Sequence, residues 1–166
     1  MERVYLGGKF HFDFLKEGYK EKASQDFRAL ILGSKDLLLN QMGSVRLSDN
    51  LEYVGPYYFE TDSMLDKDIV STEMKMIEDC TTAFFLIEDG ICPGTISEII
   101  YAATLKKNIR LFYIVDENET ESYLRSPCWY PITQSFLLAG NLVRVTPCQT
   151  YEDAVSKLIA SVKNLY

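Results

Sequence analysis

The feature that most constrains the fold is a continuous apolar run, Thr82–Ile87 (TAFFLI), which lies between two stretches of helical pattern. A strand with one face in water alternates apolar and polar side chains, and this run does not. It is typical of a central strand that is covered on both faces, as in a parallel sheet. Because parallel strands are joined by long crossovers that are usually helical, the run indicates an α/β fold built from βαβ units.

The rest of the chain repeats this alternation. Further strands are predicted at residues 4–6, 51–54, 110–115 and 142–145, and helices at 24–33, 68–79, 95–107, 132–139 and 151–165, with a loop at 116–130. Right-handed crossovers then give a doubly wound three-layer sandwich of the flavodoxin or Rossmann type, with a five-stranded, mainly parallel sheet in the order 2-1-3-4-5. No repeat or linker divides the chain, so residues 1–166 are predicted to form a single domain.

Such sheets bind ligands at the carboxyl ends of the strands, beside the point where the strand order reverses. In the predicted order, that point lies between the strand at 4–6 and the strand at 82–87. The glycine-containing loop that follows the first strand and the loop at 88–95 would both face it.

Charge and composition narrow the range of partners. The chain carries 17 Lys and Arg against 24 Asp and Glu, a formal charge of −7, and no basic run, so nucleic acid is not expected as a partner. No apolar run is long enough to span a membrane, and the start of the sequence lacks the pattern of a signal peptide. The four cysteines have no metal-ligand spacing and His11 is alone, so we expect a cytoplasmic protein with reduced thiols and no metal.

The strongest local motif surrounds Glu98, and two interpretations fit it. Thr95 and Glu98 have the T-x-x-E spacing of a capping box, in which the threonine is the N-cap and the glutamate bonds back to a free N–H group. Alternatively, a carboxylate in the first turn of this helix points into the expected crevice. There it would attack a sugar carbon and form a covalent ester.

Several segments together resemble the nucleoside 2-deoxyribosyltransferase family. Gly94-Thr95-x-x-Glu98-x-x-Tyr101-Ala102 is similar to the family's G-T-x-x-E-x-G-Y-A stretch, which contains the glutamate nucleophile. The segment at 5–10 (YLGGKF) resembles the opening strand and substrate loop, whose tyrosine positions that glutamate. The segment at 73–80 resembles a D-x-x-x-I-x-x-x-D helix, and 54–56 the end of the second strand. The matches run in order from about residue 3 to 115.

The chain departs from the family pattern at three positions. Cys92 stands where the family usually has an aspartate, six residues before the glutamate. Cys80 replaces the aspartate that closes the D-x-x-x-I-x-x-x-D helix, and Ile100 replaces a small residue. A thiol cannot accept a hydrogen bond from a sugar hydroxyl as a carboxylate does. Asp89 or Glu88, from the same loop, would have to accept that hydrogen bond instead.

Three further features have more than one interpretation each. Glu73 lies on a helix face with Ile69 and Ile77, where it either reaches solvent at the rim or binds a sugar hydroxyl. The aromatic segment at 57–59 stacks on a nucleobase, packs the loop against the domain or lines a subunit contact. Lys9 either pairs with a phosphate or is solvated.

The resemblance implies N-glycosyl transfer or hydrolysis on deoxynucleosides or their 5′-monophosphates, without a cofactor. A nucleotide-sensing domain of the same fold and an NAD-cleaving enzyme are the alternatives. The loop aromatics and the resemblance both indicate a homo-oligomer. The expected catalytic residues are Glu98 and Tyr5. The expected substrate-binding residues are Gly7, Gly8, Lys9, Phe10, Tyr57, Glu73, Asp89, Gly94 and Thr95.

Overall fold

The computed structural model describes residues 1–11, 16–39, 43–58, 66–88, 92–115 and 129–165, with residues 66 and 67 as backbone only. The strands are β1 (Glu2–Gly8), β2 (Val45–Ser48), β3 (Leu51–Gly55), β4 (Thr82–Ile87), β5 (Asn108–Ile114) and β6 (Val143–Cys148). The α-helices are α1 (Tyr19–Lys22), α2 (Phe27–Leu32), α3 (Lys35–Leu39), α4 (Asp66–Asp79), α5 (Pro93–Thr104), α6 (Trp129–Ala139) and α7 (Tyr151–Lys163). The described part of the chain also contains the short 3-10 helices η1 (Ala23–Gln25) and η4 (Gly140–Leu142).

The strands form one sheet, which in the described part of the chain has six members in the order β2-β3-β1-β4-β5-β6. All neighbours are parallel except β2 and β3, which pair antiparallel. The predicted order of the five parallel strands is confirmed. The predicted number of strands is wrong because β2, which reaches β3 through a short turn, adds an antiparallel edge strand.

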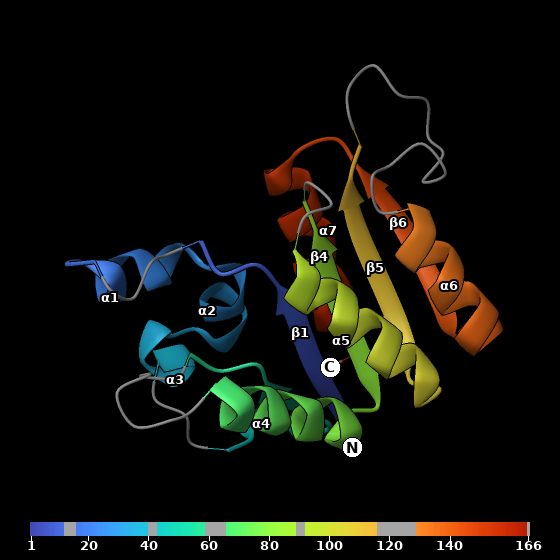
Figure 1. The fold of residues 1–166 in the computed structure, drawn as a ribbon. Coiled ribbons are helices and arrows are strands. Elements are labelled where there is room, and N and C mark those ends of the chain that lie inside the picture. The colour runs from blue at the N-terminus through green and yellow to red at the C-terminus, as the bar shows by residue number, and fades with distance from the viewer. Residues whose placement is uncertain (12–15, 40–42, 59–65, 89–91, 116–128, 166) are drawn as a thin grey trace.

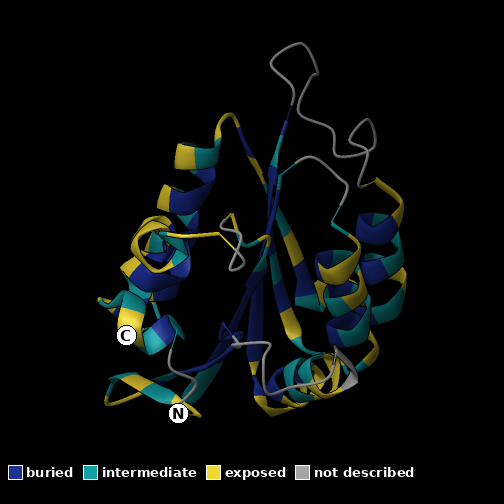
Figure 2. Ribbon diagram, turned by 60° about the vertical axis from the view of Figure 1, so that its left-hand side comes forward, coloured by how far each residue is buried: buried dark blue, intermediate teal, exposed yellow. Residues whose placement is uncertain are grey.

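Helices cover both faces of this sheet, as Figure 1 shows and as Figure 2 shows with the sheet seen close to edge-on. Helices α4, α5 and α6 lie side by side on one face, and α2 and α7 contact each other on the other. The doubly wound three-layer sandwich is therefore confirmed.

The core lies between these layers and is centred on β4, where all six residues are buried. This burial explains why its sequence does not alternate. Beside it, β1 buries Val4, Tyr5 and Leu6 completely.

The described helices differ from the predicted ones mainly near the first crossover. The single helix predicted at 24–33 is divided, because the Asp26 carboxylate accepts a hydrogen bond from the Arg28 N–H and caps a new helix, α2. Gly33 ends α2 in the left-handed conformation, as predicted. Leu30 of α2 is 57% exposed.

None of the helices in the described part of the chain has the length and apolar character needed to cross a membrane.

Candidate active site

The strand order reverses between β1 and β4, since the chain leaves β1 toward β3 and leaves β4 toward β5. Leu6 and Gly7 of β1 lie opposite Phe84 and Phe85 of β4. Beside this pair of strands, a cavity of about 660 Å³ opens between α4 and α5. It is lined by Val70, Glu73, Met74 and Ile77 of α4 and by Pro93, Gly94, Ile96, Ser97, Glu98, Ile100, Tyr101 and Thr104 of α5.

Glu98 reaches from α5 to the backbone of β1. A Cβ atom placed on Gly7 would lie 2.8 Å from Oε2 of Glu98 and 2.4 Å from the Phe85 ring. Any side chain at residue 7 would therefore displace the carboxylate or the ring. Because the glycine has no Cβ atom, the strand backbone and the carboxylate can approach each other closely.

Tyr5 lies beneath the same carboxylate. Its hydroxyl is buried and makes no hydrogen bond of good geometry with the described residues. It is nevertheless close enough to Glu98 for the two groups to influence each other. Burial, and then the charge of Glu98, hold the pKa of Tyr5 well above its usual value, so the hydroxyl keeps its proton. A protonated hydroxyl beside a carboxylate can orient it by donating.

The environment of Glu98 disfavours its charged form. Burial, and next the charge of Glu73, raise the pKa of Glu98 to about 8, while Tyr5 and Arg28 oppose the rise. Perturbed carboxyl groups in a cleft are typical of functional sites. This property distinguishes Glu98 from a carboxylate on a solvated helix face.

Glu73, on α4, lines the cavity together with Glu98. Burial raises the pKa of Glu73, and Arg28 again opposes the rise. Since Glu73 faces the cavity and influences Glu98, the structure brings together two carboxyl groups that lie on successive helices and are separated in the sequence by β4.

Thr95 does not cap α5, so the capping-box interpretation of Glu98 is wrong. Pro93 opens the helix and Cys92 is the N-cap, without a side-chain hydrogen bond. Thr95 lies inside the helix, where its buried hydroxyl donates to Sγ of Cys92 at 3.1 Å. Gly94 is exposed at the mouth of the cavity.

The loop after β1 is held by two residues that the sequence analysis did not identify, Asp26 and Arg28. The Arg28 guanidinium donates to the Gly8 carbonyl at 3.0 Å and to the Lys9 carbonyl at 3.1 Å. The Phe10 ring lies over this guanidinium, 3.7 Å from its carbon. Lys9 thus contributes a backbone carbonyl, while the side chain of Lys9 is exposed.

Of the predicted site residues that the structure describes, Glu73, Gly94 and Glu98 line this cavity, and the others do not: Tyr5, Gly7, Gly8, Lys9, Phe10, Tyr57 and Thr95. Tyr57 is 1% exposed and packs edge to face on Tyr53, so its ring offers no open face to a nucleobase. Packing accounts for this residue. Asp89 lies outside the described residues.

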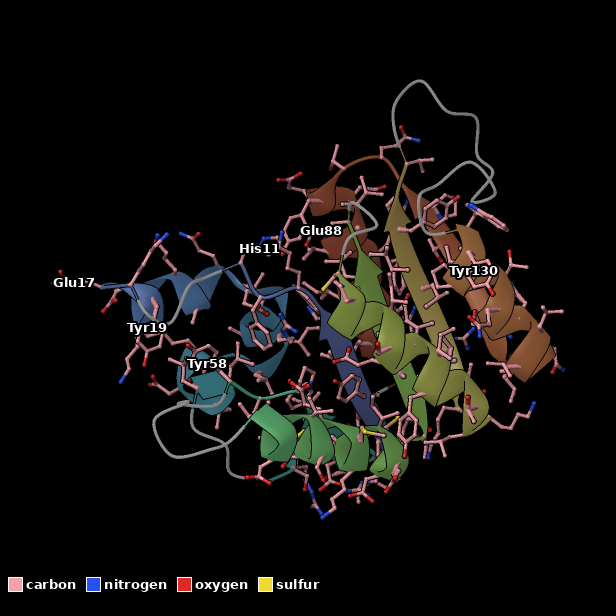
Figure 3. All side chains as sticks on the ribbon, in the orientation of Figure 1. His11, Glu17, Tyr19, Tyr58, Glu88 and Tyr130 are labelled. Atoms are coloured by element: carbon pink, nitrogen blue, oxygen red, sulfur yellow. The ribbon has the colours of Figure 1, made fainter. Side chains whose placement is uncertain are left out.

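A second cavity, of about 380 Å³, opens beside the ends of β1 and β4 and is lined by His11, Lys22, Gln25, Asp26, Glu88 and Tyr151. Nε2 of His11 lies 2.5 Å from Oε1 of Glu88, and Figure 3 shows the two side chains meeting across the loops. The His11 ring contacts Tyr151 edge to face.

Among the described residues, no three His, Cys, Asp or Glu side chains gather in a way that would hold a metal ion.

Comparisons with known proteins match the fold but not the sequence. No protein-family model matches the chain, and no curated protein sequence matches it. Among solved structures, the chain is similar to the CMP N-glycosidase BcmB of Clostridium botulinum, with a TM-score of 0.52 and 19% identity, covering 96% of this chain and 99% of that one.

It is also similar to two structures of Era. One is a point variant of the Aquifex aeolicus protein bound to GDP·AlF4⁻, with a TM-score of 0.51 and 13% identity over 98% of this chain. The other is Era with MgGDPNP and a 16S ribosomal RNA segment, with a TM-score of 0.50 and 14% identity over 99% of this chain. The chain spans 56% of either Era structure. At these identities the likeness shows a shared fold.

Proposed function

We propose that the protein cleaves the N-glycosidic bond of deoxynucleosides or deoxynucleoside 5′-monophosphates, with Glu98 as the nucleophile. The observation that carries the proposal is the position of Glu98: a half-buried side chain whose carboxylate lies against Gly7 and close to Tyr5, on the lining of the cavity and at the point of strand reversal. The whole-length likeness to a CMP N-glycosidase supports the same chemistry.

In the first step, a carboxylate oxygen of Glu98 attacks the anomeric carbon. The bond from that carbon to the base nitrogen breaks, its electron pair stays with the base, and the base takes up a proton. A sugar ester of Glu98 results. Water or a second base then attacks the same carbon, gives up a proton, and releases the Glu98 carboxylate.

The surrounding residues have separate roles in this scheme. Tyr5 orients Glu98 by donating from its hydroxyl, and Glu73 accepts a hydrogen bond from a sugar hydroxyl in the cavity. Gly7 leaves room for the Glu98 carboxylate to lie against the backbone of β1. The raised pKa leaves roughly a tenth of Glu98 ionised at neutral pH, so the rate should rise with pH up to about 8.

The test is a chromatographic screen for released base. Deoxynucleosides, their 5′-monophosphates, CMP and NAD are each incubated with the wild type and with Glu98→Gln. Release by the wild type alone supports the proposal, and mass spectrometry of the quenched protein should detect the sugar ester. A free base added as acceptor separates transfer from hydrolysis. Equal release by both proteins would contradict the role of Glu98, and release from NAD alone would indicate the NAD-cleaving alternative.

A second candidate, a nucleotide-sensing domain without turnover, rests on Cys92. A thiol that accepts from Thr95 at 3.1 Å occupies the position where the resembling family has an aspartate. A sensor would bind one of the same compounds with a clear thermal shift and release no base. Restoring the carboxylate with Cys92→Asp would then produce base release if the missing group is what prevents turnover.

A further inference from the structure

Arg28 is a fully buried cation at the base of the site. Its side chain is 0% exposed, although arginine is rarely buried without a specific partner. Asp26 provides that partner in a two-point contact, with Nε to Oδ1 at 2.8 Å and Nη2 to Oδ2 at 2.7 Å. The Asp26 side chain is 1% exposed, so the whole pair is removed from water.

The remaining donors of Arg28 go to the loop that contacts the site. Nη1 donates to the Gly8 carbonyl and Nη2 to the Lys9 carbonyl. The guanidinium plane lies against the Phe10 ring at 3.7 Å and the Phe27 ring at 4.8 Å. The flat, forked guanidinium suits this combination of a two-point contact, carbonyls and ring faces, and an ammonium group could not reproduce it.

This loop continues directly from the backbone that touches the Glu98 carboxylate. Gly7 is the residue whose missing Cβ leaves room for Oε2 of Glu98, and Gly8 is its neighbour. Arg28 comes from α2, on the face of the sheet opposite α4 and α5. Arg28 therefore holds the end of β1 from one face of the sheet, while Glu98 contacts β1 from the other face.

The charge of Arg28 also reaches the two carboxyl groups of the cavity. It lowers the pKa of both Glu98 and Glu73, against the effect of burial.

We propose that Arg28 is a positioning residue of the Glu98 site, which fixes the Gly7–Phe10 backbone from behind the sheet and provides the positive charge that favours the ionised carboxylate. The inference rests on the proposed function for its effect on rate. Its effect on the backbone and on the charge of Glu98 is independent of any reaction.

The principal test is the double variant Asp26→Asn/Arg28→Gln. It removes both charges at once, because either single change would leave an unpaired charge buried and would strongly destabilise the fold. The matched control is Asp153→Asn/Lys157→Gln, which removes an ion pair of 2.8 Å on the outside of α7. Circular dichroism checks that each variant is folded.

The first measurement is the titration of the Glu98 carboxyl carbon by NMR in ¹³C-Glu protein, with the signal assigned from its loss in Glu98→Gln. We expect the pKa of Glu98 in the double variant to rise above the wild-type value, and the control to match the wild type. An unchanged titration in the folded double variant overturns the charge role. This measurement needs no turnover, so it decides the inference even if the screen shows that the wild type releases no base.

The second measurement is kcat/KM for base release against pH. The double variant should lose about 10-fold to 100-fold near neutral pH and move its ascending limb to higher pH. Arg28→Lys keeps the charge but not the fork, so we expect a limb near the wild-type position together with a loss of about 10-fold. Wild-type kcat/KM in both variants overturns the positioning role.

Discussion

Gly7 shows how much of the site depends on a missing side chain. The Phe85 ring and Oε2 of Glu98 occupy the space that a Cβ atom would need. Neither neighbour can move freely, because the ring belongs to the central strand and the carboxylate to the first turns of α5. The glycine is therefore required by packing between elements and not by an unusual backbone turn.

Gly7→Ala should accordingly lower both the stability of the protein and its release of base. We expect a loss of about 1–3 kcal/mol in the free energy of unfolding, together with loss of base release, because the added methyl group displaces Glu98 or Phe85. Denaturant unfolding measures the first effect. Gly94→Ala is the control for stability, since nothing lies within 4 Å of a Cβ atom there. Equal stabilities of the two variants would show that β1 accommodates the methyl group.

Glu98→Gln should stabilise the protein in a pH-dependent way. The pKa of Glu98 is raised to about 8, so the folded state holds its proton more tightly than the unfolded state, and the stability it contributes is lost as the pH rises from the unfolded pKa through about 8. Removing the titratable group should gain about 3–5 kcal/mol near pH 8 and close to nothing at pH 4.

Thermal unfolding at both pH values measures this gain, which corresponds to about 6–20 °C in Tm at the higher pH. The exposed Glu17→Gln is the control and should show no such difference. A gain that is equal at both pH values would contradict the burial of a charged group as its cause.

At the scale of elements, the same sequence pattern has two different structural outcomes. Thr150 and Asp153 share the spacing of Thr95 and Glu98, and there the motif does cap a helix. Thr150 is the N-cap of α7, and its side chain accepts from the Asp153 N–H. The Asp153 carboxylate accepts in turn from the N–H of Gln149. What separates the two cases is Pro93, whose position starts α5 two residues before Thr95.

Thr150→Ala should lower the free energy of unfolding by about 1 kcal/mol, because one free N–H at the start of α7 loses its partner. Urea unfolding measures the loss. Thr150→Ser keeps the hydroxyl and should stay close to the wild type. If the alanine and serine variants are equally stable, water replaces the cap at no cost.

The sequence was sufficient for the elements whose pattern is long or continuous. The apolar run of β4, the helix α4 and the helix α7 all lie within a few residues of their predicted bounds. The strand β2 was missed because four residues with mixed side chains give little pattern, and its pairing depends on β3.

The proximity of Glu98 to Tyr5 and Gly7 could be predicted, because Glu98 comes soon after β4 and the other two lie in the neighbouring strand β1. The position of Arg28 could not be predicted, since an arginine in a short amphipathic helix normally faces water. Nothing in the sequence shows that the Asp26 carboxylate and two backbone carbonyls accept hydrogen bonds from this arginine. Tyr57 was ambiguous for a related reason: an aromatic residue after a strand packs or binds according to contacts that are distant in sequence.

At the scale of the whole molecule, one outer layer exposes large apolar side chains. Leu137, Trp129 and Tyr130 of α6 and Val70 and Met74 of α4 are all exposed on the layer that contains α5. Leu137 is 83% exposed. Apolar side chains gathered on one layer are typical of a surface that a second subunit covers.

We therefore expect a homo-oligomer that associates through this layer. Light scattering after size exclusion should give at least twice the monomer mass, and Leu137→Asp should lower it by placing a charge in the contact. Leu30→Asp is the matched control, because Leu30 is 57% exposed but lies on α2, on the other face. A monomeric wild type would contradict the prediction outright.

The strand order also determines the stage of synthesis at which the cavity between α4 and α5 can form. During synthesis β1 emerges first, yet its neighbours β3 and β4 are completed only at residues 55 and 87, and α5 follows later still. Until β3 and β4 have been synthesised, the apolar side chains of β1 have no partner strand. Nascent chains in such a state aggregate or engage chaperones. A ribosome that stalls before residue 51 would therefore hold β1 without a partner strand, and one that stalls between β4 and α5 would hold a paired β1 but no cavity.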